Sequence, residues 1–114
     1  MEKSLVVGVD IGAQSSKLGI VDARGNILCQ SVITSLQNEL SEYVDDLVKA
    51  IEALIDQVGG KHLIKGVGIG APNANYYKGT SECAANLTWG RDANGQGIYI
   101  DFAKIVSSRL GIPV

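Results

Sequence analysis

The sequence predicts an α/β fold with a mixed β-sheet, in the element order β-β-β-α-β-α-(β). Short apolar runs separated by turn residues fill the first third of the chain, which is typical of antiparallel strands joined by tight turns. A long stretch follows in which apolar residues recur every three or four positions, as in a helix that covers a sheet. A glycine-rich apolar run after that helix predicts a fourth strand, parallel to the first because a helix connects the two.

Length and composition indicate one globular domain. The chain has 114 residues, of which 46% are hydrophobic and 19% are charged, enough for one core and too few for two domains. The formal net charge is −2 and no Lys/Arg cluster occurs, which argues against nucleic acid as a partner. No apolar run approaches the roughly 20 residues that cross a membrane. Because no leader-type segment precedes the first strand, we expect a cytoplasmic protein.

The first predicted strand has Asp10 at its end and is followed by a tight turn. Gly12 permits a sharp reversal, Ser15 and Ser16 are small and polar, and a second apolar run begins near Leu18. Such a turn directs backbone N–H groups and hydroxyls toward one point, which suits phosphate oxygens. A carboxylate beside it suits Mg²⁺, held directly or through water. The sequence therefore predicts a nucleotide-phosphate site, and a merely structural hairpin is the alternative.

A third strand is expected over residues 27–33, and a helix follows over residues 39–58. Asn38 is the expected N-cap of that helix, and the glycines at 59–60 are its expected end. The apolar stripe of the helix consists of Leu40, Val44, Leu47, Ile51, Leu54 and Val58. The first strand is nearly all apolar, which predicts a central position covered on both faces of the sheet.

The fourth strand is expected over residues 63–70. Residues 71–97 are rich in Gly, Asn, Thr and Ser and lack periodicity, so we expect a long loop that is either functional or disordered. Helical spacing resumes over residues 98–110, and Gly111 is the expected end of that helix. Residues 112–114 resemble the opening of another strand.

The cysteines and the histidine do not have the spacing of metal ligands. Cys29 and Cys83 are the only cysteines and form no CxxC motif, so we expect two reduced thiols. His62 is the only histidine and follows a Gly-Gly-Lys turn signal, where an exposed side chain is expected rather than a catalytic base.

Two segments resemble a known family. VVGVDIGAQSSKLGIVD resembles the first phosphate motif of the sugar-kinase, heat-shock-protein and actin superfamily. VGIGAPNANYYKGT, followed by AANLTW, resembles the ROK family of repressors, open reading frames and sugar kinases. The predicted element order also matches the ribonuclease-H-like half-domain of the actin-like ATPases, and the two motifs together are more specific than either alone. The resemblance covers essentially the whole chain and implies that residues 1–114 are the N-terminal lobe of a longer ROK-type protein.

The resemblance also implies a role for each matching residue of the first motif. These nucleotide-site residues are Asp10, Gly12, Ala13, Gln14, Ser15, Ser16 and Lys17. Asp10 would lie near Mg²⁺, and the turn would approach the β- and γ-phosphates of ATP. Ala13 and Gln14 stand where the family usually has glycine and threonine. A methyl group at Ala13 narrows the backbone conformations open to the turn, whereas Gln14 still offers hydrogen bonds to an oxygen.

The second pair of motifs implies a sugar site at Asn73, Ala74 and Asn86. Amide side chains both donate and accept hydrogen bonds, which suits vicinal sugar hydroxyls. The nearby aromatic residues Trp89, Tyr76 and Tyr77 are expected to cover the core rather than to form a sugar platform.

The resemblance implies, for the intact protein, a glucokinase-like hexose kinase that uses ATP and Mg²⁺. In the family, an Asn-Asp pair that follows a GIPV-like segment supplies the catalytic base. That base is therefore expected just after Val114, and no catalytic residue is expected within this chain. The family's zinc motif is absent too, so we expect no zinc site here and no turnover by these 114 residues alone. A sugar and a nucleotide are the expected small-molecule partners, and the sequence leaves open whether the protein is a homodimer.

Other functions remain as alternatives. The first is a sugar-sensing, non-catalytic effector domain of a ROK-type repressor. The second alternative is another branch of the same superfamily, and the third is a structural role unrelated to phosphate.

Overall fold

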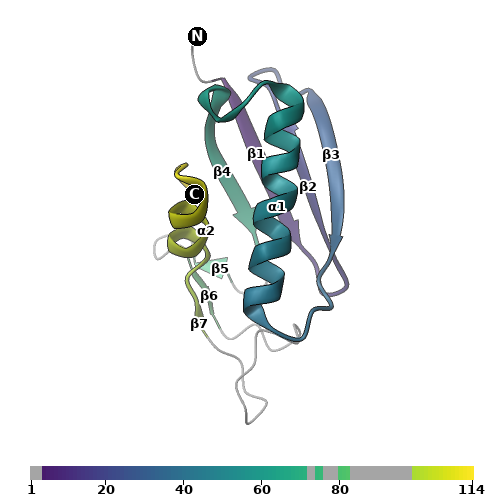
Figure 1. Ribbon diagram of the computed structural model, residues 1–114, viewed down its shortest axis with the longest axis vertical. Coiled ribbons are helices and arrows are strands. Elements are labelled where there is room, and N and C mark those ends of the chain that lie inside the picture. Colours follow the sequence, from purple (N-terminus) through teal and green to yellow (C-terminus); the bar gives the residue numbers. More distant parts are fainter. Residues whose placement is uncertain (1–3, 72–73, 76–79, 83–98) are drawn as a thin grey trace.

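The computed structural model describes residues 4–71, 74–75, 80–82 and 99–114. Its main sheet has four strands, in the order β3-β2-β1-β4. These strands are β1 (Leu5–Ile11), β2 (Ser15–Val21), β3 (Ile27–Thr34) and β4 (Ile64–Gly70). Strand β2 is antiparallel to both β1 and β3, and β4 is parallel to β1 (Figure 1). The predicted mixed sheet and its strand directions are confirmed.

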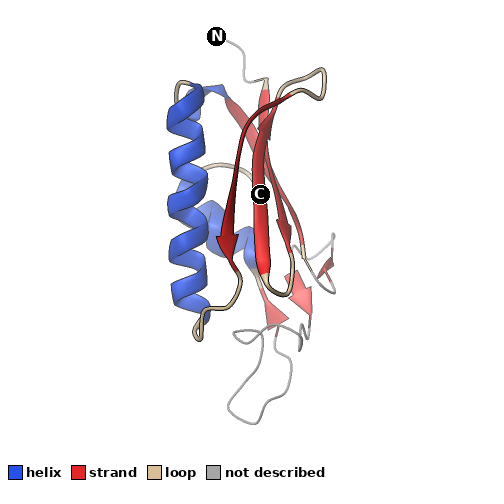
Figure 2. Cartoon of the chain, turned by 90° about the vertical axis from the view of Figure 1, so that its right-hand side faces the viewer, coloured by secondary structure: helices blue, strands red, loops and turns tan. Residues whose placement is uncertain are grey.

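Helix α1 (Leu40–Val58) covers one face of this sheet (Figure 2). Its buried stripe consists of Tyr43, Val44, Leu47, Val48, Ile51, Leu54 and Ile55. The helix ends as predicted, with Gly59 at a φ of 120° that favours glycine. Its N-cap is Glu39, whose side chain makes no capping hydrogen bond, so the prediction of Asn38 as the cap is wrong. A 3₁₀ turn, η1 (Lys61–Leu63), then leads into β4.

The opposite, outer face of the sheet is not covered by any described residue (Figure 2). Gly8 and Asp10 of β1 are exposed on this outer face. Gly8 lies in register with Gly19 on β2 and with Gly68 on β4. The expectation that β1 is covered on both faces is therefore wrong for the part described. The strand is central and apolar, but two of its three outward positions, Gly8 and Asp10, carry no apolar side chain.

Three short strands follow in the second part of the chain. They are β5 (Ala74–Asn75), β6 (Thr80–Glu82) and β7 (Tyr99–Ile100), and they form a second sheet in the order β5-β6-β7. The expected unbroken loop over residues 71–97 is therefore wrong at β5 and β6, because strands of two or three residues leave no periodic pattern to detect.

The second helix, α2 (Phe102–Leu110), begins four residues later than expected. Tyr99–Ile100 pairs with β6 instead of entering the helix. The Asp101 side chain caps the helix by accepting a hydrogen bond from the Lys104 N–H, at 3.2 Å. The helix ends as predicted at Gly111, whose φ is 70°. Asp101 is the type of residue that favours an N-cap, and it marks the boundary that the apolar spacing missed.

The two helices lie on the same side of the main sheet (Figure 2). Arg109 on α2 and Asp45 on α1 form a salt bridge of 3.0 Å at the surface. After α2, the Pro113 carbonyl accepts a hydrogen bond of 2.9 Å from the Val67 N–H. Residues 112–114 thus lie beside β4, as a further strand would, although they are not assigned as one. Neither described helix is long and apolar enough to cross a membrane.

Candidate functional site

One edge of the main sheet gathers the features that the sequence predicts for ligand binding. Strands β1, β3 and β4 run in the same direction, so their carboxyl ends lie at this edge together with the β1–β2 turn and the start of α1 (Figure 1). In α/β sheets, ligands bind in the crevice outside the carboxyl ends of the strands. The predicted phosphate turn and the segment that follows β4 both leave the sheet here.

The β1–β2 turn, residues 12–14, has a tightly closed backbone. The Gly12 N–H donates a hydrogen bond of 3.0 Å to the Ser15 carbonyl. A Cβ atom at Gly12 would lie 2.8 Å from that same oxygen, so the close approach requires glycine. Ala13 and Gln14 form an exposed tip, and the Gln14 carbonyl accepts a hydrogen bond of 3.0 Å from the Ser35 N–H. The turn is therefore tied to the connection between β3 and α1.

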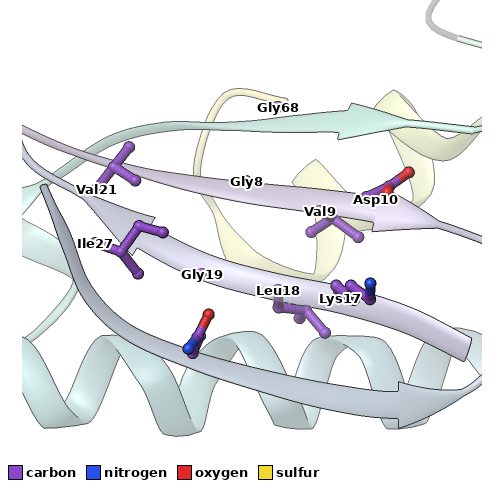
Figure 3. Close-up of a pocket in the computed structure, with 10 residues that line it drawn as sticks. Gly8, Val9, Asp10, Lys17, Leu18, Gly19, Val21, Ile27 and Gly68 are labelled. Carbon is purple, nitrogen blue, oxygen red and sulfur yellow. The ribbon is translucent and has the colours of Figure 1, made fainter. Parts of the chain in front are cut away.

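Asp10 and Lys17 face solvent on the outer face of the sheet, directly opposite each other in register. They line one end of a shallow hollow whose floor includes Gly8, Gly19 and Gly68 (Figure 3). Asp10 lies two residues before Gly12, so its exposed carboxylate is close in sequence to the turn and does not point into the core. An exposed carboxylate is the type of ligand that Mg²⁺ takes together with phosphate oxygens.

The donor set fits Mg²⁺ bound together with phosphate. Magnesium in such sites is held by one or two carboxylates plus substrate phosphates and water, and Asp10 offers one carboxylate at the sheet edge. Among the described residues, no three His, Cys, Asp or Glu side chains come together as a metal-binding group.

Ser16 is placed differently from the other predicted phosphate residues. Its side chain is fully buried, on the face of β2 that also carries Leu18 and Ile20. Its hydroxyl is hydrogen-bonded to the Ser35 hydroxyl at 2.7 Å and to the Tyr43 hydroxyl at 2.5 Å. The structure therefore separates this hydroxyl from the exposed tip. Alternation along β2 is the signal that places Ser16 inside, and it was available in the sequence.

The sugar residues can be placed only in part. Asn73 and Asn86 lie outside the described residues. Ala74 is the first residue of β5, and its backbone pairs with Ser81 of β6. The predicted sugar site therefore stays a prediction.

We expect the substitution Gly12→Ala to lower the free energy of unfolding by about 1–3 kcal/mol, as overpacking against fixed atoms typically does. Gly8→Ala is the matched control, because a Cβ there meets nothing within 4 Å and should change stability by no more than about 0.5 kcal/mol. Urea unfolding of both variants measures the difference. Equal losses at the two positions would contradict the requirement for glycine in the turn.

Comparison with known proteins identifies similar sequences and folds. The chain matches the ROK family over residues 6–114. The glucokinase of Streptomyces coelicolor is 32% identical over 111 residues, which are 96% of this chain and 31% of that protein. A crystal structure of a ROK family glucokinase from Streptomyces griseus, in complex with glucose and AMPPNP, has a TM-score of 0.77 and 27% identity, over 96% of this chain and 31% of that one.

A regulator shares the fold as well. The crystal structure of a ROK family transcriptional regulator, a homolog of the E. coli MLC protein, has a TM-score of 0.76 at 12% identity, over 96% of this chain and 26% of that one. This likeness concerns the fold alone. The chain thus spans 31% of the length of the glucokinase relatives that it matches.

Proposed function

The chain belongs to the ROK family, and from that membership we propose that it is the N-terminal lobe of an ATP-dependent hexose kinase. Its fold is the actin-like ATPase half-domain found in ROK glucokinases. The observation that carries the proposal is the exposed Asp10 carboxylate near a closed turn, at the edge where parallel strands end. Phosphoryl transfer depends mainly on positioning and on electrostatic stabilisation of the phosphates, and these are the two contributions that we propose for this edge.

The proposal assigns roles to the tip of the turn and to the two charged residues beside it. The backbone N–H groups of Ala13 and Gln14, at the exposed tip, donate to the terminal phosphates of ATP. Asp10 would hold Mg²⁺, and Lys17 would add positive charge on the same face. Mg²⁺ bound to the phosphates would offset their negative charge. The residues proposed for the sugar hydroxyls are Asn73, Ala74 and Asn86.

The relatives favour a kinase over a sensor. The Streptomyces griseus glucokinase was crystallised with glucose and AMPPNP, which supports a hexose and ATP as the ligands of the intact protein. The alternative is a sugar-sensing, non-catalytic domain of a ROK-type regulator. The regulator is 12% identical to this chain, whereas the curated glucokinase is 32% identical, so we propose the kinase.

The test is a phosphorylation assay of the intact protein that contains this chain. We expect ADP release with MgATP and at least one of glucose, mannose, fructose and the N-acetyl hexosamines. We expect no turnover from residues 1–114 alone, because the proposed base lies just after Val114 and the second wall of the cleft belongs to the other lobe. Sugar binding by calorimetry without any ADP release would favour the sensor. Turnover by residues 1–114 alone would contradict the proposal that the catalytic base and the second wall of the cleft lie outside these residues.

A further inference from the structure

Three buried hydroxyl groups lie next to the turn at residues 12–14. They belong to Ser16 on β2, Ser35 directly after β3 and Tyr43 on α1, with exposed fractions of 0%, 1% and 0%. We call these three residues the hydroxyl cluster. Buried hydroxyls are costly unless they are hydrogen-bonded, and here Ser16 bonds both others, at 2.7 Å to Ser35 and 2.5 Å to Tyr43. The cluster therefore joins three elements of the fold in otherwise apolar surroundings, where such bonds are strengthened.

The phenol of Tyr43 remains protonated under ordinary conditions. Burial raises the pKa of Tyr43 from 10.0 to about 12, against the smaller opposing effect of the hydrogen bonds with Ser16 and Ser35. At physiological pH the neutral Tyr43 hydroxyl can therefore donate a hydrogen bond within the hydroxyl cluster.

The hydroxyl cluster is connected at two points to the end of the turn that leads into β2. At the first point, Ser16 follows Ser15, whose carbonyl accepts the hydrogen bond that closes the turn at Gly12. At the second point, the Ser35 N–H donates to the Gln14 carbonyl at 3.0 Å. Tyr43 is the fourth residue of the long helix α1. A single side chain on the helix is thereby linked, through two serines, to two consecutive residues at this end of the turn.

We propose that the hydroxyl cluster positions the turn for nucleotide, so that Tyr43 sets the affinity for ATP without touching it. This inference rests on the proposed function, because it assigns a support to the same phosphate turn. A turn that is already held in its binding shape loses less conformational entropy when phosphate binds. Tyr43 is accordingly a positioning residue, acting through Ser16 and Ser35.

The test uses Tyr43→Phe in the intact protein, because this change removes the hydroxyl and keeps the ring. We expect the KM for ATP and the dissociation constant for AMPPNP with Mg²⁺ to rise about 3- to 10-fold, the range that corresponds to one hydrogen bond. The KM for the sugar and kcat at saturating ATP should stay unchanged. In the nucleotide-free protein, amide hydrogen exchange at Ser35 should become faster.

The matched control is Ile55→Val, which removes one methylene group from the core at the C-terminal end of the same helix. It lowers stability modestly and should leave AMPPNP affinity and Ser35 exchange as in the wild type. A second variant, Ser16→Ala, removes the central hydroxyl of the hydroxyl cluster and should reproduce the effect of Tyr43→Phe on ATP, which keeps the inference testable where one variant fails to fold.

The inference is overturned when the folded variants of the hydroxyl cluster bind AMPPNP as the wild type does. It is equally overturned when Ile55→Val weakens AMPPNP binding as much as Tyr43→Phe, since the effect would then come from stability alone. Failure of the proposed function has a different signature, because the wild-type intact protein itself would bind no AMPPNP.

Discussion

The substitution Asp10→Asn in the intact protein is expected to lower kcat for sugar phosphorylation by about 10²- to 10³-fold, the loss typical of removing one preorganised electrostatic group from an active site. The amide has the size of the carboxylate but lacks its charge, so it is a weaker partner for Mg²⁺. Because Asp10 is exposed on β1, the fold should be retained. Steady-state kinetics with saturating MgATP and the sugar accepted by the wild type measure the effect.

Asp56→Asn provides the matched control for this prediction. Asp56 is an exposed carboxylate near the end of α1, so the substitution makes the same change in charge away from the turn. Its kcat should equal that of the wild type. Turnover by Asp10→Asn within a factor of about two of the control would remove Asp10 from the proposed site.

Ile51→Ala is expected to have the largest effect on stability, about 2–5 kcal/mol off the free energy of unfolding. Ile51 is 0% exposed at the middle of α1, within the hydrophobic core between the helices and the main sheet. Truncation leaves a cavity there in addition to the lost apolar burial. A domain of this size has a total stability of roughly 5–15 kcal/mol, so the variant should be partly unfolded under mild denaturing conditions.

Val32→Ala on β3 is the control for the core variant, because Val32 is 63% exposed. We expect its stability to lie within about 0.5 kcal/mol of the wild type. Urea unfolding monitored by circular dichroism gives the free energy of unfolding of both variants. The dependence of that free energy on urea concentration should be the same in both. A loss at Val32 as large as that at Ile51 would mean that the outer face is covered, contrary to the architecture described.

The elements with strong local patterns could be predicted from the sequence. Helix α1 has an apolar stripe along its length and two glycines after its last residue, so its existence and its C-terminal end follow from spacing and end signals, whereas its N-cap was predicted one residue too early. The start of α2 could not be placed by spacing, because Ile98 continues the apolar pattern backwards past the true N-cap, Asp101. Pairing of β7 with β6 decides that boundary, and such pairing is a tertiary interaction.

In the candidate site, too, only the residues with a local sequence pattern could be predicted. Asp10 and Gly12 could be identified because the strand, the acid and the turn are adjacent in the sequence. The hydroxyl cluster could not, since Ser16, Ser35 and Tyr43 are brought together only when α1 packs on the sheet. Tyr43 was not part of the apolar stripe predicted from the sequence, and its burial is known only from the structure.

The central claim is that the turn after β1, with Asp10 beside it, receives the terminal phosphates of a nucleotide. Titration of the isotopically labelled intact protein with AMPPNP and Mg²⁺, followed by NMR of the backbone amides, tests it most directly. We expect the amides of Gly12, Ala13 and Gln14 to shift the most among residues 5–21, and Asp10→Asn to weaken this response. Saturation with AMPPNP while these three amides remain unmoved would contradict it.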